Sequence, residues 1–89
     1  MADIKARRIG DNQVVEEIQL DSSDITAKEV QLTNTPDPTK IVVHIVSGTT
    51  QTSQVDYIVV GDKINWDGRG METILSDGER LVVSYSILV

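Results

Sequence analysis

The stretch VDYIVVGDKINW, residues 55–66, contains the clearest strand–turn–strand pattern in the sequence. Its two halves, 55–60 and 63–66, are rich in β-branched and aromatic residues, which suit strands. Gly61 and Asp62 separate the halves, and a glycine that begins a two-residue loop is typical of the type II′ turn. The stretch therefore predicts a β-hairpin with a tight turn at Gly61-Asp62.

Residues 80–88 alternate apolar and polar side chains, as in a strand with one buried face. The residues predicted to face inward are Leu81, Val83, Tyr85 and Ile87. The opposite face carries Arg80, Ser84 and Ser86, together with the apolar exceptions Val82 and Leu88. Because these two apolar side chains interrupt a polar face, they indicate self-association or packing by another segment.

Four more segments favour strands, namely 4–9, 14–20, 28–32 and 41–46. The run 41–46 is apolar on one face and mixed on the other, which favours a central strand covered on both sides.

The connection at 34–38 contains two prolines, and neither is expected inside a central strand. Residues 71–75 read instead as one helical turn that caps an open end of the fold, with Met71, Ile74 and Leu75 on a shared face.

About seven strands at intervals of roughly 8–12 residues predict an all-β domain. The expected architecture is a β-sandwich of immunoglobulin or fibronectin type, with a small barrel as the alternative. We expect one domain over residues 1–89, since a chain of 89 residues supports one core. Residues 1–24 are expected to form an N-terminal arm or an added edge strand, because the boundary at 21–24 is polar and turn-like.

The chain carries a formal charge of −6 and has no cysteine, which excludes disulfides and thiolate metal sites. An acidic chain also argues against nucleic acid as the partner. The charge is uneven, because Lys5, Arg7 and Arg8 are three of the eight basic residues. A basic N-terminal segment on an acidic body predicts attraction to an acidic partner surface.

No apolar run approaches the roughly 20 residues of a membrane span. The charged N-terminus also lacks the apolar stretch of a signal peptide, so neither a membrane nor Sec-type export is expected.

The candidates for chemistry each have a stronger structural interpretation. His44 is the single histidine and lies in a β-branched run without a nucleophile-elbow pattern beside it. The carboxylates that neighbour turns do not follow the spacing of a calcium loop, and aspartate favours turns through its own hydrogen bonds. They are Asp56, Asp62, Asp67 and Asp77. We therefore expect no catalytic residue, no cofactor and no metal site.

The three aromatic residues, Tyr57, Trp66 and Tyr85, fall on inward-looking strand positions, which indicates a core role rather than a sugar platform. Gly68-Arg69-Gly70 lacks the ending of a phosphate-binding loop, so its glycines are expected to allow positive φ in a bend. Arg69 between them is a candidate contact residue, since arginine is favoured at interfaces.

The hairpin at 55–66 continues through DGRGM to residue 71 and ends in the strand LVVSY, residues 81–85. This arrangement resembles a pattern of structural proteins of tailed bacteriophages, written V-D-Y-x-V-x-G-x-x-I-x-W-x-G-x-G-L and followed by G-D-x-L-x-V-x-Y. The resemblance covers about residues 27–86 and departs from the pattern at Met71 and Glu79.

The resemblance implies a non-enzymatic virion protein, made in the host cytoplasm. At this size, a capsid decoration (cement) protein bound to the major capsid protein, as an oligomer or in a lattice, is the leading expectation. A tail, baseplate or fibre subunit, or a module that binds a receptor or glycan, is the alternative. The candidate partner-binding residues are Lys5, Arg7, Arg8, Arg69, Val82 and Leu88.

Overall fold

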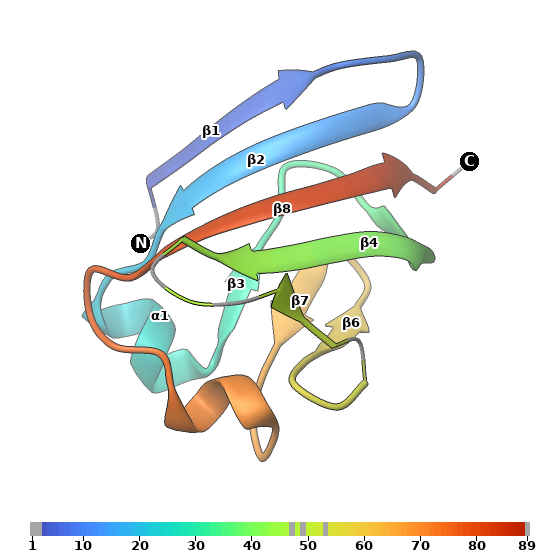
Figure 1. The fold of residues 1–89 in the computed structure, drawn as a ribbon. Helices are drawn as coiled ribbons and strands as arrows, with labels where there is room; N and C mark the ends of the chain where they lie inside the picture. The colour runs from blue at the N-terminus through green and yellow to red at the C-terminus, as the bar shows by residue number, and fades with distance from the viewer. Residues whose placement is uncertain (1–2, 47, 49, 53, 89) are drawn as a thin grey trace.

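The computed structural model describes residues 3–46, 48, 50–52 and 54–88. Within them lie eight strands, one α-helix and one 3₁₀ helix, arranged as two antiparallel sheets (Figure 1). The prediction of an all-β fold is therefore confirmed. The eighth strand, which the sequence did not indicate, has only two residues.

The larger sheet has five strands in the order β1-β2-β8-β4-β5. Their bounds are β1 Asp3–Arg8, β2 Gln13–Gln19, β8 Arg80–Ile87, β4 Pro36–Ile45 and β5 Thr50–Gln51. The smaller sheet has three strands in the order β3-β7-β6. Their bounds are β3 Glu29–Gln31, β7 Lys63–Asn65 and β6 Ile58–Val60. Helix α1 (Ser22–Ala27) joins β2 to β3, and the 3₁₀ helix η1 (Gly70–Thr73) follows β7.

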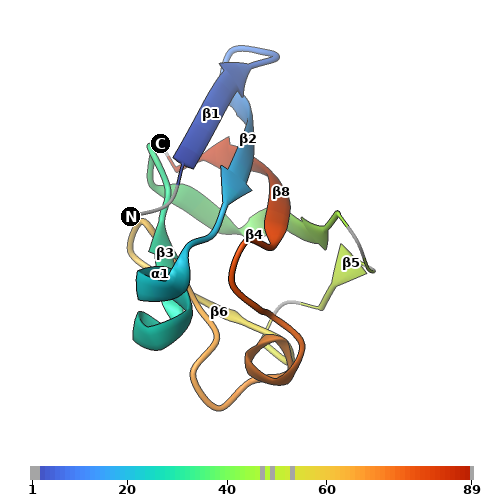
Figure 2. The same cartoon turned by 90° about the vertical axis from the view of Figure 1, so that its left-hand side faces the viewer.

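Buried side chains of both sheets belong to one hydrophobic cluster. Figure 2 shows the larger sheet above the smaller one. Along β8, Leu81, Val83 and Tyr85 are at most 1% exposed, as the alternation predicts. Tyr57 and Trp66 are also 1% exposed, so the expected core role of all three aromatic residues is confirmed. Strand β8 is central, since it pairs with β2 on one side and with β4 on the other.

The predicted hairpin is present as β6 and β7, with Val60 paired to Lys63 across the turn. Gly61 has φ 61°, while Asp62 is not among the described non-glycine residues with positive φ. This is the combination that a type II′ turn requires. The hairpin prediction is therefore confirmed, although β6 begins only at Ile58.

Helix α1 was missed, since its first residues were interpreted as a polar turn. The Asp21 carboxylate accepts hydrogen bonds from the backbone N–H groups of Ser23 and Asp24, at 3.0 and 3.1 Å. The Asp24 carboxylate accepts one from the backbone N–H of Asp21, at 3.0 Å. This reciprocal capping box satisfies N–H groups that a helix start leaves without partners.

The connection predicted at 34–38 is shorter than expected, because β4 begins at Pro36 and includes Pro38. The register between β4 and β8 shifts between Pro36 and Ile41, so regular pairing is interrupted over this segment. On its other side, β4 pairs with β5 only at Val43 and His44. The prolines therefore occupy a bulged part of the strand with an open side, where a missing N–H is tolerated.

The helical turn predicted at 71–75 is present as η1, and Met71 and Leu75 are buried as expected. Ile74 is 52% exposed, so its predicted place on the same buried face is wrong. Helix η1 ends at Thr73, and Ile74 is its C-cap with φ −117° and ψ −14°, so the helical face on which the prediction rests does not extend to Ile74.

Candidate protein-binding surface

The outer face of the larger sheet, turned away from the core, carries a group of apolar side chains. The register places Val15 of β2 and Val42 of β4 on either side of Ser84 in β8. Two residues along β8, Val82 lies between Glu17 and His44. Val46 follows β4, and its N–H donates to Arg80 O at 3.0 Å. We name Val15, Val42, Val46 and Val82 the valine patch.

The valine patch is open to solvent in the chain by itself. Val42 is 51% and Val46 is 53% exposed, while Val15 and Val82 are partly buried by their neighbours. The expectation that strand 41–46 is covered on both faces is therefore wrong, since Val42 and Val46 stay more than half exposed on the outer face among the described residues. Leu88, the other apolar exception of the last strand, is 53% exposed and lies beyond the end of β8.

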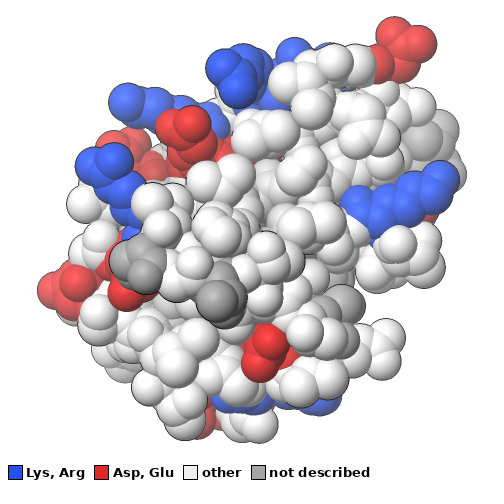
Figure 3. Space-filling model, viewed as in Figure 1, with Lys and Arg blue, Asp and Glu red and all other residues white. Residues whose placement is uncertain are grey.

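Basic side chains border this face along β1, the edge strand. Lys5 pairs with Glu17 and Arg7 pairs with Val15, so both side chains belong to the outer face. Figure 3 shows Lys and Arg atoms gathered along the upper margin, above a broad white area over β8 and β4. Arg8 has the opposite parity, and its Nη1 donates to the Asp11 carbonyl oxygen at 3.1 Å. The structure thus places two of the three N-terminal cations beside the valine patch.

A hollow of 280 Å³ lies where β1 and the valine patch meet. Its charged lining residues are Asp3, Lys5, Glu17 and Arg80, and its apolar lining includes Val46 and Val82. Because it offers both signs of charge beside exposed methyl groups, it suits the mixed polar and apolar side chains of a protein partner.

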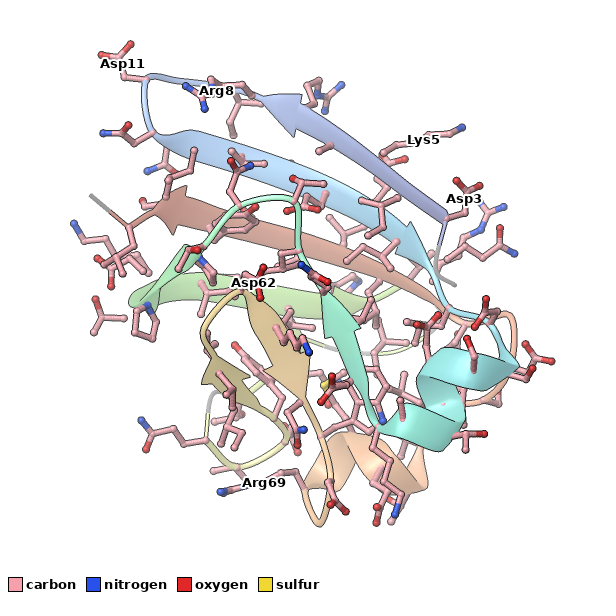
Figure 4. All side chains as sticks on the ribbon, turned by 180° about the vertical axis from the view of Figure 1, so that it is seen from behind. Asp3, Lys5, Arg8, Asp11, Asp62 and Arg69 are labelled. Carbon is pink, nitrogen blue, oxygen red and sulfur yellow. The ribbon has the colours of Figure 1, made fainter. Side chains whose placement is uncertain are left out.

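Arg69 is not part of this surface. Its Nη1 donates to the Gln54 carbonyl oxygen at 2.5 Å, which braces a loop where Gln54 has φ 67°. Figure 4 shows Arg69 at the opposite end of the molecule from Lys5 and Arg8. Arg69 also lines a separate hollow of 260 Å³ with Pro38 and Val59.

The two glycines that flank Arg69 have different roles. Gly68 has φ 69°, as predicted for a tight bend. Gly70 does not have positive φ, so that expectation is wrong for this residue. A Cβ at position 70 would collide with the Asp56 carboxylate, which accepts a hydrogen bond from Thr52 N at 2.7 Å. Gly70 is therefore required by close packing.

Glu16 is a buried carboxyl group that the sequence reasoning missed. It is 0% exposed, and its two carboxylate oxygens lie 3.1 and 3.2 Å from the Thr33 backbone nitrogen, which donates to them. The Tyr85 hydroxyl also donates to it. The signal was present, because Glu16 lies on the inward parity of β2 between Val14 and Ile18. Burial raises the pKa of Tyr85, and the hydrogen bond to Glu16 raises it further.

The outer face of the smaller sheet has polar pairs at β3 and β7, beside Ile58 and Val60 of β6. Lys63 Nζ lies 3.1 Å from Glu29 Oε2, and Gln31 Nε2 donates to Asp62 Oδ2 at 2.9 Å. The first contact joins β7 to β3 and the second joins β3 to the turn before β7, so these four polar side chains have partners within the chain.

A second ionic group links helix α1 to η1. Lys28 Nζ lies 2.7 Å from Glu72 Oε1 and 3.5 Å from Asp67 Oδ1. The hydrogen bond from Lys28 lowers the pKa of Glu72, since it favours the ionised carboxylate.

The remaining candidates for chemistry make local contacts. The ring Nδ1 of His44 lies 3.3 Å from Thr50 Oγ1 on the outer face of the larger sheet. Among the residues that the structure describes, no three His, Cys, Asp or Glu side chains cluster so that they could hold a metal ion. In the same described part of the chain, no helix has the length and apolar character needed to cross a membrane.

Comparison with known proteins assigns no family to the chain. No family model, no curated protein and no solved structure matches it.

Proposed function

We propose that this chain is a non-enzymatic structural protein that binds other protein chains through the outer face of its larger sheet. The valine patch carries the proposal, because exposed apolar side chains grouped on a sheet face are typical of contact surfaces. The cations of β1 at its margin supply a polar rim, as protein interfaces have. The burial of all three aromatic residues supports this function over glycan binding, which uses exposed aromatic rings.

Within this class, we propose a virion component of a tailed bacteriophage, with capsid decoration as the leading role. The sequence pattern of residues 27–86, the small size and the basic margin of an acidic chain support this role. The major capsid protein would be the partner, and copies of the chain would sit on the capsid as oligomers or in a lattice. A tail, baseplate or fibre subunit is the alternative role. The finer assignment of the two sheets to an immunoglobulin- or fibronectin-like sandwich belongs to the same proposal, supported by their shared core.

The test compares two matched valine substitutions. Val42→Glu places a charge in the valine patch, whereas Val60→Glu changes an equally exposed valine (51% and 54%) on β6 of the smaller sheet. The genes that neighbour the coding gene are used to identify the phage. Capsids and tails of that phage are prepared without this protein, and the purified protein is then added to each. Occupancy is measured by co-sedimentation, after thermal unfolding has shown that both variants fold.

We expect wild-type protein and Val60→Glu to sediment with capsids and Val42→Glu to remain in the supernatant. If the wild-type protein sediments only with tails, it is a tail, baseplate or fibre subunit and not a capsid decoration protein. Equal binding of the two variants would overturn the assignment of the valine patch as the contact surface.

A further inference from the structure

We propose that β1 is a docking edge, to which an extended acidic segment of a partner protein adds as a further antiparallel strand. The contact uses the backbone of β1 and the side chains of Lys5 and Arg7. It shares Lys5 and Arg7 with the margin of the valine patch but uses the free backbone edge of β1, so it extends the proposed function without needing the valines.

The hydrogen-bond pattern shows which backbone groups of β1 are open. Ile9 N donates to Gln13 O at 2.9 Å, so this pair bonds across the β1–β2 ladder. On the other side of β2, Ile87 N donates to Asn12 O at 2.7 Å and Leu20 N donates to Glu79 O at 2.9 Å. The odd-numbered residues of β2 therefore bond to β1, and the even-numbered residues bond to β8.

Antiparallel ladders alternate between bonded and non-bonded pairs, so the odd-numbered residues of β1 bond to β2. The N–H and C=O groups of Ile4, Ala6 and Arg8 consequently point away from β2, along the free edge. Such a row of backbone groups is a template for another strand. Figure 1 shows β1 as the outermost strand of the larger sheet.

The other edge strands of the described sheets are shorter. Strand β5 has two residues, and β3 and β6 have three each, whereas β1 has six. Strand β4 also has an open side before Val43, but Pro36 and Pro38 remove two of its N–H groups, whereas the six residues of β1 include no proline.

The charges on β1 select the partner. Lys5 and Arg7 are exposed and occupy positions that would be non-hydrogen-bonded with an added strand, where side chains approach most closely. Arg7 lies opposite the uncharged Val15, and Lys5 lies opposite Glu17. A partner strand with acidic side chains two residues apart would place one carboxylate beside each cation.

The same charges disfavour a second copy of the chain on this edge. Antiparallel pairing of two β1 strands must place outward residues opposite outward residues. Of the two registers with the greatest overlap, one would put Lys5 opposite Arg7 of the other copy twice, and like charges directly opposite each other destabilise a sheet. The other would put Lys5 opposite Lys5 and each Arg7 opposite Asp3 of the other copy, so it combines like and opposite charges. An acidic partner avoids the like-charge pairs of both registers.

The test uses two synthetic peptides and the full chain. The acidic peptide is acetyl-Thr-Val-Glu-Val-Glu-Val-Thr-amide, and the control peptide has lysine in place of each glutamate. Binding is followed by NMR of the backbone amides of labelled protein, with amide hydrogen exchange measured at saturation. We expect the acidic peptide to bind, to slow exchange at Ile4, Ala6 and Arg8, and to bind Val42→Glu as it binds the wild type.

Ala6→Pro is the decisive variant, because it removes one N–H on the free edge and leaves the β1–β2 hydrogen bonds in place. We expect it to weaken peptide binding about tenfold, while Ala6→Val, which keeps the N–H, binds like the wild type. If Ala6→Pro fails to fold, Lys5→Glu/Arg7→Glu serves instead, and it should prefer the lysine peptide. The proposal is overturned if neither peptide binds at millimolar concentration, or if Ala6→Pro binds the acidic peptide as tightly as the wild type does. It is also overturned if the NMR chemical-shift changes centre on Val42 and Val82, or if the chain dimerises through β1.

Discussion

The two sheets share one core, yet their outer faces differ. On the smaller sheet, Lys63 pairs with Glu29 and Gln31 pairs with Asp62, so these four polar side chains have partners within the chain. On the larger sheet, the central positions of the outer face are occupied by the valine patch. This difference is the reason for proposing the outer face of the larger sheet, rather than that of the smaller sheet, as the contact surface.

The contrast concerns grouping rather than the presence of apolar residues. Val60 on the smaller sheet is 54% exposed, which is similar to Val42. Single exposed apolar side chains are common on protein surfaces and need no partner. The valine patch differs because the register brings four valines from three segments onto one face.

The largest expected effect is a loss of stability in the core that the two sheets share. Glu16→Ala leaves the Thr33 N–H and the Tyr85 hydroxyl without their buried acceptor. We expect a loss of about 3 kcal/mol in unfolding free energy, or roughly 15 °C in Tm, because the buried Tyr85 hydroxyl and the Thr33 N–H both lose this acceptor. Urea unfolding should show one transition for both sheets.

Glu16→Gln is the matched control, since it keeps a side chain of the same shape with an acceptor oxygen. It should retain most of the stability. If alanine and glutamine have the same small effect, Glu16 does not hold the two sheets together. If Glu16→Ala unfolds in two steps, the two sheets unfold as separate units. The premise that both outer faces belong to one shared core would then be wrong.

A smaller effect is expected at the link between the sheets. Helix α1 connects β2 of the larger sheet to β3 of the smaller one, and Asp21 caps its start. Asp21→Ala should lower Tm by about 5 °C, because it removes the acceptor for two backbone N–H groups. Asp21→Asn keeps a capping oxygen and should lie close to the wild type. A normal Tm for Asp21→Ala would show that α1 forms without its cap.

The smallest effect on stability is expected from a substitution on the outer face of the smaller sheet. Lys63→Met removes the ion pair with Glu29 and keeps the aliphatic part of the side chain. Both partners are partly exposed, so Tm should fall by about 2 °C or less, and the difference should shrink in high salt. A fall above roughly 5 °C, independent of salt, would mean that this face is held by more than screened surface charges.

Much of the fold follows from local patterns in the sequence. Alternation along β8 correctly predicts the buried side chains, because the side-chain period of a strand is two. The turn at Gly61 is predictable for a similarly local reason, since glycine adopts positive φ without strain. Helix α1 is not predicted from the apolar pattern, because a six-residue helix offers little periodicity. The spacing of Asp21 and Asp24 is nevertheless a capping signal.

The candidate surface depends on register, which local patterns do not contain. Val82 stands out in the sequence as an apolar residue on a polar face, and the clustering of Lys5 and Arg7 is also visible there. That Val15, Val42 and Val46 surround Val82 follows only from the pairing of β2, β8 and β4. Alternation along β1 already separates Arg8 from Lys5 and Arg7, but that the latter two share a face with the valine patch follows only from the pairing of β1 with β2.

The central position of β8 has a consequence for how the chain folds during synthesis. Strands β2 and β4 do not pair with each other, because each pairs with β8 between them. Residues 80–87 leave the ribosome after β2 and β4. The five-stranded sheet therefore cannot assemble until β8 has been synthesised. Folding must therefore wait for β8, and it depends on contacts between residues as distant as Gln13 and Ser86. Such non-local pairing makes folding slow, and until β8 arrives the strand edges of β2 and β4 remain available to chaperones or to other copies of the chain.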